Sequence, residues 1–367
     1  MKGLGSPASR LVDVLCMPSR ASSSSDAQWS ELVAVARSTN LIGPLAAKLA
    51  DAGVTAPPRA ERHLEGARQL ATRQRLSVRW EAHGLQTTLG GLGIPVMLLK
   101  GAAYVMSPDH LGAGRMFGDI DVLVPHAALG DVESALMLAG WVSAKADAYD
   151  QHYYRQWMHE IPPMQHIRRN TVIDVHHNIL PLTSRNAPNP ARIIARATPL
   201  PALPALRVPA PEDLLVHSIT HLVHEGELHN GLRDLHDIHS MLQRFGPTPG
   251  FWGRLLDSGA GNDLAGPLLL GLRLAQAVFE SEVPAEVLAT LVAQAAPRWR
   301  RRWLLPVYAR ALRPPTDEGA GMAEAAARLT IFVRSHALRM PMPLLLRHLS
   351  VKAWKGLLPQ QRPAADG

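Results

Sequence analysis

The chain has 367 residues, of which 47% are hydrophobic, and a formal net charge of +7. This length and apolar content allow a large buried core and indicate about two or three domains. A single cysteine, Cys16, excludes an internal disulfide framework and is typical of a reducing compartment. The sequence has no apolar run of the roughly 18 residues that span a membrane, and its N-terminus is a poor signal peptide. We therefore expect a globular cytoplasmic protein.

The N-terminal region is predicted to be mostly helical. Residues 1–26 are rich in serine and are expected to be a loosely ordered N-terminus. Residues 27–92 form an N-terminal helical region, because apolar side chains recur at helical spacing over residues 29–52 and over residues 59–89. The second stretch is typical of one long amphipathic helix, which a cluster of glycines ends at residues 90–93.

The region 93–180 is predicted to hold a small mixed β-sheet. Its first strand, residues 94–99, is a short apolar run that leads into Lys100 and Gly101 and then into a segment that could form a helix. A strand that ends in this way can bring backbone N–H groups and an ammonium to a phosphate. A simple strand-ending turn explains the same pair, so the motif depends on its context.

The next predicted strand, residues 119–124, carries two acids. Alternation places Asp119 and Asp121 on one face and the aliphatic side chains on the other. Two carboxylates on one face repel each other unless a cation lies between them, and hard oxygen ligands suit Mg²⁺ that carries a triphosphate. An exposed strand end is the alternative interpretation. Arg115 could neutralise a phosphate or pair with these acids, and Gly118 would relieve crowding beside the metal.

A third acid follows in a predicted hairpin. A helix is expected at residues 127–139, and two strands at residues 152–168 and 171–178 are joined by a turn. The second of these strands would place Asp174 beside the strand of Asp119 and Asp121. Alternation directs His176 to the same side as Asp174.

The second half of the chain is predicted to be helical. Residues 181–212 are rich in proline and are interpreted as a linker, residues 213–355 as a helical C-terminal domain and residues 356–367 as a tail. Helices are expected at residues 211–225, 231–245, 250–258, 264–279, 284–295, 298–312 and 322–339.

Two groups of polar residues lie on these predicted helices. His217, His221 and His224 share one helical face and could ligate zinc, but without a nearby cluster of acids or cysteines we favour helix packing and predict no zinc site. Arg233 and Asp237, at positions i and i+4, could form a structural ion pair or line a nucleotide cleft.

The positive charge is concentrated near the C-terminus. Residues 298–355 hold twelve Lys or Arg against three acids. Such a basic segment can bind nucleic acid or can be a solvated helical face, and it lacks the regularly spaced aromatic residues that stack on bases. Nucleic acid is therefore one possible partner of this segment.

The order of these motifs resembles a known family. Leu-Lys-Gly at residues 99–101, Arg-x-x-Gly-Asp-Ile-Asp at residues 115–121 and Asp-x-His at residues 174–176 are similar to an uncharacterised bacterial branch of the DNA polymerase β-type nucleotidyltransferase superfamily. The resemblance covers roughly residues 30–245. It implies an α+β fold in which a small mixed sheet is embedded in helical N- and C-terminal regions.

The resemblance also implies an activity. A nucleoside monophosphate would be transferred from an NTP to an acceptor, which is a small molecule, a peptide or protein, or an RNA end. Asp119, Asp121 and Asp174 would be the catalytic residues and would bind Mg²⁺ or Mn²⁺. The residues that would bind the nucleotide are Lys100, Gly101, Arg115, Gly118 and Arg233. The family usually has Gly or Ser where this chain has Ala102, so the phosphates would be met by backbone N–H groups and Lys100.

An alternative function belongs to another class. A protein of this fold that is catalytically weak or inactive could act as an accessory factor, or bind RNA through its basic helical segment. The Gly101-Ala102 pair supports this alternative. The three aspartates favour the enzyme, because a scaffold has no physical need for three converging carboxylates.

Overall fold

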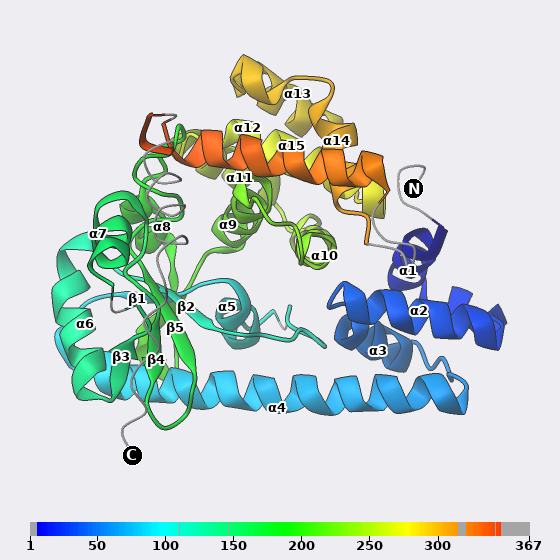
Figure 1. Cartoon of the computed structure of the whole chain (residues 1–367), viewed down its shortest axis with the longest axis horizontal. Helices are drawn as coiled ribbons and strands as arrows, with labels where there is room; N and C mark the ends of the chain where they lie inside the picture. Colours follow the sequence, from blue (N-terminus) through cyan, green and yellow to red (C-terminus); the bar gives the residue numbers. More distant parts are fainter. Residues whose placement is uncertain (1–5, 110, 146, 315–320, 342, 346–367) are drawn as a thin grey trace, which may run out of the picture.

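The computed structural model describes residues 6–109, 111–145, 147–314, 321–341 and 343–345. The fold is α+β, as predicted, with helices on both sides of a mixed sheet (Figure 1). Buried side chains from the first helix to the last form one apolar cluster. No helix within these ranges is long and apolar enough to cross a membrane. The predicted tail, residues 356–367, and residues 346–355 of the basic segment lie outside the described residues.

The sheet has seven strands in the order β3-β4-β5-β2-β1-β7-β6. In chain order the strands are β1 (Val96–Leu98), β2 (Ile120–Leu123), β3 (Trp141–Ser143), β4 (Met164–His166), β5 (Val172–His176), β6 (Thr198–Leu200) and β7 (Leu203–Val208). Strand β2 pairs antiparallel with β1 and parallel with β5, and β1 pairs parallel with β7. The register of β2 and β5 sets Asp121 opposite Asp174.

Among the described residues, four α-helices precede the sheet: α1 (Ser6–Cys16), α2 (Asp26–Ser38), α3 (Ile42–Asp51) and α4 (Pro58–Leu89). The long helix α4 confirms the prediction for residues 59–89 and runs along the side of the molecule below the sheet in Figure 1. The prediction of a loose N-terminus is wrong over residues 6–16. Helix α1 packs against α2, α3 and the later helix α12. Its side chains Leu11 and Leu15 are fully buried.

Short helices separate the strands: α5 (Lys100–Met106), α6 (Leu129–Leu138) and α7 (Ala148–Trp157). The antiparallel pair β4 and β5 confirms the predicted hairpin, but its first strand is much shorter than expected. Residues 152–157 are helical because Asp147 caps α7, its side chain accepting hydrogen bonds from the N–H groups of Tyr149 and Asp150.

The proline-rich segment is not a linker. Residues 181–212 contribute the helix α8 (Pro190–Arg196) and the strands β6 and β7, so the sheet extends past the predicted boundary at residue 180. The prolines are compatible with this structure because of where they lie. Pro190 is in the first turn of α8, and Pro199 is on β6, which is the edge strand of the sheet.

The remaining helices agree with the sequence. They are α9 (Pro211–His224), α10 (Gly231–Phe245), α11 (Phe251–Gly261), α12 (Ala265–Phe279), α13 (Ala285–Gln294), α14 (Leu304–Ala311) and α15 (Met322–Arg339). The one marked difference is at residues 298–312, where a 3₁₀ turn at Pro297–Trp299 precedes α14. In Figure 1, α15 crosses above α9 and α10, on the side of the molecule opposite α4.

Candidate active site

The three predicted aspartates meet at two neighbouring strands. Asp119 immediately precedes β2, Asp121 lies within β2 and Asp174 lies in the middle of β5. The alternate residues of these strands are buried in the core, which turns all three carboxylates to the other face. One oxygen from each carboxylate lies within 4.8 Å of the others. The structure therefore brings together the three acids that the sequence singled out.

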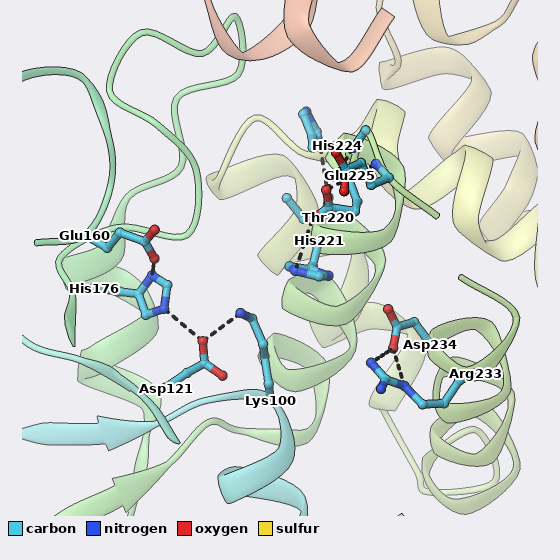
Figure 2. Close-up of polar contacts among 12 residues, drawn as sticks. Lys100, Asp121, Glu160, His176, Thr220, His221, His224, Glu225, Arg233 and Asp234 are labelled. Carbon is cyan, nitrogen blue, oxygen red and sulfur yellow. Dashed lines mark hydrogen bonds and ion pairs between the residues drawn. The ribbon is translucent and has the colours of Figure 1, made fainter. Parts of the chain in front are cut away.

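Asp121 is the centre of a chain of charged contacts (Figure 2). Lys100 Nζ donates to Asp121 Oδ1 at 2.6 Å, and His176 Nε2 lies 3.0 Å from the same oxygen. On the other side of the ring, His176 Nδ1 lies 3.1 Å from Glu160 Oε2. Sequence alternation placed His176 on this side, but it gave no signal for Glu160, which lies in a loop outside the named strands.

These contacts set the charges at the site. Burial would raise the pKa of Asp121, but Lys100 and His176 hold it well below its usual range. Burial would lower the pKa of Lys100, but Asp121 raises it. The pKa of His176 is raised in the same way, because Glu160 and Asp121 outweigh its burial. The result is a carboxylate that lies between the Lys100 ammonium and the His176 ring.

The pKa values of the other two aspartates, Asp119 and Asp174, are raised rather than lowered. Burial and the charge of Asp121, with a further contribution from Glu160, raise the pKa of Asp174 to about 7. Its Oδ1 atom is buried and has no hydrogen-bond partner among the described residues. Burial and Asp121 also raise the pKa of Asp119, although its side chain reaches solvent. Ionisation of Asp119 and Asp174 is therefore unfavourable beside the charged Asp121.

A cavity of about 420 Å³ opens beside the aspartates. All five residues predicted to bind the nucleotide line it, together with Asp119 and Asp121. His221 of α9 and Asn230, which directly precedes α10, are further lining residues that were not predicted to bind the nucleotide. The full lining is Asn40, Lys100, Gly101, Arg115, Met116, Phe117, Gly118, Asp119, Asp121, His221, Asn230 and Arg233.

The two arginines of the cavity have acidic partners on α10. Arg115 is buried, and its Nε donates to Asp237 Oδ2 at 2.7 Å rather than to Asp119 or Asp121. Arg233 pairs with Asp234, with Nη2 at 2.8 Å from Oδ1. The alternative of an i, i+4 pair between Arg233 and Asp237 is therefore wrong, and Arg233 lies on the cavity wall opposite Asp121 (Figure 2).

The two glycines of the cavity differ in what surrounds them. A Cβ atom on Gly101 would lie 2.1 Å from Cδ1 of Phe117, so close packing requires glycine there. A Cβ atom on Gly118 would meet no atom within 4 Å, so crowding within the protein does not explain that glycine. The structure instead leaves open space at Gly118, on the wall of the cavity.

The histidines of α9 differ in their surroundings. Within the described ranges, two groups have ligand atoms close enough to hold an ion: the three aspartates, and His159 with Glu160 and His176. His217 and His224 are buried, and burial lowers the pKa of both, so they pack as neutral side chains. His221 lines the cavity, with Nε2 3.7 Å from Glu225.

Comparison with known proteins identifies a family for the part of the chain that contains the site. Residues 25–280 match the model of a family described as uncharacterised nucleotidyltransferases. The matched segment is more than half of the chain, contains all seven strands and the three aspartates, and ends at the C-terminus of α12. No curated protein and no solved structure matches the chain.

Proposed function

Because the chain belongs to this family of uncharacterised nucleotidyltransferases, we propose that it transfers a nucleoside monophosphate from an NTP to an acceptor. The observation that carries the proposal is the meeting of Asp119, Asp121 and Asp174 beside a cavity. Asp119 and Asp121 line this cavity together with Lys100 and Arg233. Clustered carboxylates beside fixed positive side chains suit a substrate that consists of phosphates and divalent ions.

The donor set fits a hard divalent cation. Three carboxylates converge within 4.8 Å, and a buried oxygen of Asp174 has no partner within the described protein. We assign Asp119, Asp121 and Asp174 as ligands of Mg²⁺ or Mn²⁺. Such ions, when bound, would stabilise negative charge on the attacking and leaving oxygens of phosphoryl transfer.

The other residues have roles that follow from their contacts. His176, fixed by Glu160, orients Asp121 from the side opposite Lys100. Lys100 Nζ and Arg233 supply positive charge to the cavity, where the triphosphate would lie. Asp174, which lies opposite Asp121 on the paired strand, is the group to which we assign removal of the acceptor's proton.

The chemistry does not restrict the acceptor to one class. A small molecule, a peptide or protein, and an RNA end each offer a hydroxyl or phosphate nucleophile. The regularly spaced aromatics that stack on bases are missing from the basic segment at residues 298–355, and on that ground we favour a small molecule or a peptide.

The test is pyrophosphate release from each NTP with Mg²⁺ or Mn²⁺. Asp119→Asn is the informative variant, because Asp121→Asn would also remove the partner of Lys100 and His176. We expect Asp119→Asn to lower turnover by at least about 100-fold. Asp131→Asn, an exposed acid on α6, is the matched control and should retain full activity.

Two outcomes would contradict the proposal. Equal turnover in Asp119→Asn and wild type would remove the aspartates from the site. NTP binding without pyrophosphate release, for every NTP and both metals, would instead favour a binding protein of the same fold.

A further inference from the structure

Four arginines surround a second cavity, far along the chain from the aspartates. Its volume is about 210 Å³, and it is lined by Arg185, Arg298, Arg301, Trp303, Arg334, Ala337 and Leu338. We call it the arginine cavity. None of its lining residues is acidic, and within the described ranges none of the four arginines forms an ion pair. By contrast, Arg310 and Arg313 nearby both pair with Glu324.

Arg334, on α15, is held in place without an acid. Its guanidinium stacks on the ring of Trp299, with Cζ 4.4 Å from the ring centroid. Its Nη1 donates to the Tyr308 hydroxyl at 2.9 Å, and that hydroxyl donates to the carbonyl of Val223 at 2.6 Å. One face and one edge of the guanidinium are therefore fixed, and the group also lines the cavity.

A loop from the sheet domain closes the other side. The N–H of Arg185 donates to the carbonyl of Leu338 at 2.9 Å, and the Thr183 hydroxyl donates to the carbonyl of Arg339 at 2.6 Å. These bonds fix the loop after β5 against the last turn of α15. Arg185 thus joins Arg334 from a distant part of the sequence, and the cavity is a feature of the folded chain.

The positive charges of Arg298, Arg301 and Arg334 repel one another in the arginine cavity. Burial lowers the pKa of Arg334, and the charges of Arg298 and Arg301 lower it further, while Tyr308 opposes them. One donor of a lining side chain, Arg298 Nε, is buried and has no acceptor among the described residues. A bound anion would compensate the positive charge and could accept a hydrogen bond from this donor.

We propose that the arginine cavity binds a phosphate group of a ligand other than the NTP substrate. Planar guanidinium groups match the oxygens of phosphate, and several of them converge here. The volume of about 210 Å³ is below the range of pockets that enclose whole small-molecule ligands, so the rest of the ligand lies outside, where Trp303 is 40% exposed. Arg298, Arg301, Trp303 and Arg334 lie beyond residue 280, so family membership does not imply this site.

The site is independent of nucleotidyl transfer, and its test uses neither NTP nor divalent ions. Pyrophosphate is titrated into the protein by calorimetry, and the melting temperature is followed in parallel. We expect binding that raises the melting temperature. In Arg301→Gln, affinity should fall by about 10–100-fold, because a charge-assisted hydrogen bond is lost.

The chain offers a matched control and an independent variant. Arg302→Gln changes an exposed arginine that does not line the cavity, and should bind pyrophosphate as wild type does. Arg185 lies in another segment but lines the same cavity, so Arg185→Gln should weaken pyrophosphate binding as Arg301→Gln does. No binding to wild type, or equal affinity in Arg301→Gln and Arg302→Gln, would overturn the proposal.

A short single-stranded RNA then identifies the source of the phosphate. If the ligand is a nucleic acid, RNA binds more tightly than pyrophosphate, and its affinity falls steeply with salt, with a smaller slope in Arg301→Gln. If the ligand is a small phosphorylated compound, pyrophosphate binds at least as tightly as RNA. Either result supports the phosphate site, provided that Arg302→Gln leaves it unchanged.

Discussion

Asp174 and Asp121 lie opposite each other on paired strands, yet their surroundings give them opposite protonation behaviour. Asp121 is flanked by Lys100 and His176, which stabilise its charge. Asp174 has a buried oxygen without a partner among the described residues, and burial and the nearby acids raise its pKa to about 7. In the metal-free protein the charge of Asp174 therefore opposes folding.

The pH dependence of the stability of Asp174→Asn tests whether the charge of Asp174 opposes folding. A carboxyl whose pKa is raised from about 3.8 to about 7 on folding destabilises the folded state as pH rises through this window. We expect Asp174→Asn to be more stable than wild type at pH 8 by about 1–3 kcal/mol, and the difference to vanish below pH ~4. Urea denaturation in EDTA at both pH values measures it. A variant less stable than wild type at pH 8 would contradict the assigned charge state.

The aspartates were predictable from sequence because Asp121 and Asp174 lie in strands of aliphatic residues, where alternation fixes their face, and Asp119 directly precedes the strand of Asp121. His176 was predictable for the same reason. Glu160 was not, because it reaches His176 from a loop through a single isolated bridge between the two residues. A local pattern cannot show a contact that depends on how a loop crosses the end of a strand.

At the scale of elements, the junction of β1 and α5 depends on one close contact. Gly101 is the second residue of α5, directly after Lys100, and the ring of Phe117 packs against its Cα. Phe117 belongs to the segment that leads from Arg115 to Asp119 along the cavity wall. The glycine therefore lets this segment approach the end of β1 and places Lys100 near Asp121.

Gly101→Ala should displace this segment. A Cβ atom 2.1 Å from Phe117 forces the ring to move, which should cost about 1–3 kcal/mol of stability and lower NTP affinity. Phe117→Leu in the same chain should recover part of the stability. The control is Gly118→Ala, which has open space and should fold as wild type. Thermal denaturation of the four proteins is the measurement, and equal loss in both alanine variants would exclude the contact as the cause.

Most elements of the chain were predictable because their periodicity is local. The helices α4, α9, α10 and α12 carry clear apolar stripes and were placed to within about two residues. The strands β6 and β7 were missed because prolines punctuate their sequence. Strand β7 pairs with β1, which lies far earlier in the chain, and β6 joins the sheet through β7. Long-range pairing of this kind leaves little trace in a local pattern.

At the scale of the molecule, α1 connects helices that lie far apart in the sequence. It contacts α2 and α3 on one side and α12 on the other. Leu11 and Leu15 are fully buried in this contact. The N-terminal helix is therefore part of the common apolar core rather than an appendage to it.

Leu11→Ala should destabilise the whole protein. Removal of a fully buried leucine side chain costs about 2–5 kcal/mol. The matched control is Leu138→Ala, at a leucine that is 92% exposed, with an expected change within about 0.5 kcal/mol. Urea denaturation followed by circular dichroism and by tryptophan fluorescence should give one shifted transition for Leu11→Ala. A separate early transition would show that α1 unfolds alone.

The parallel pairing of β1 with β7 has a consequence for the order in which the protein is made. Val96 pairs with Leu206, and everything between them must leave the ribosome before that ladder can form. Until then β1 has an open edge whose backbone groups can pair with another chain. A nascent chain that stops before β7 therefore exposes the strand that leads to Lys100. Translation past residue 208 is what completes the sheet around the aspartates.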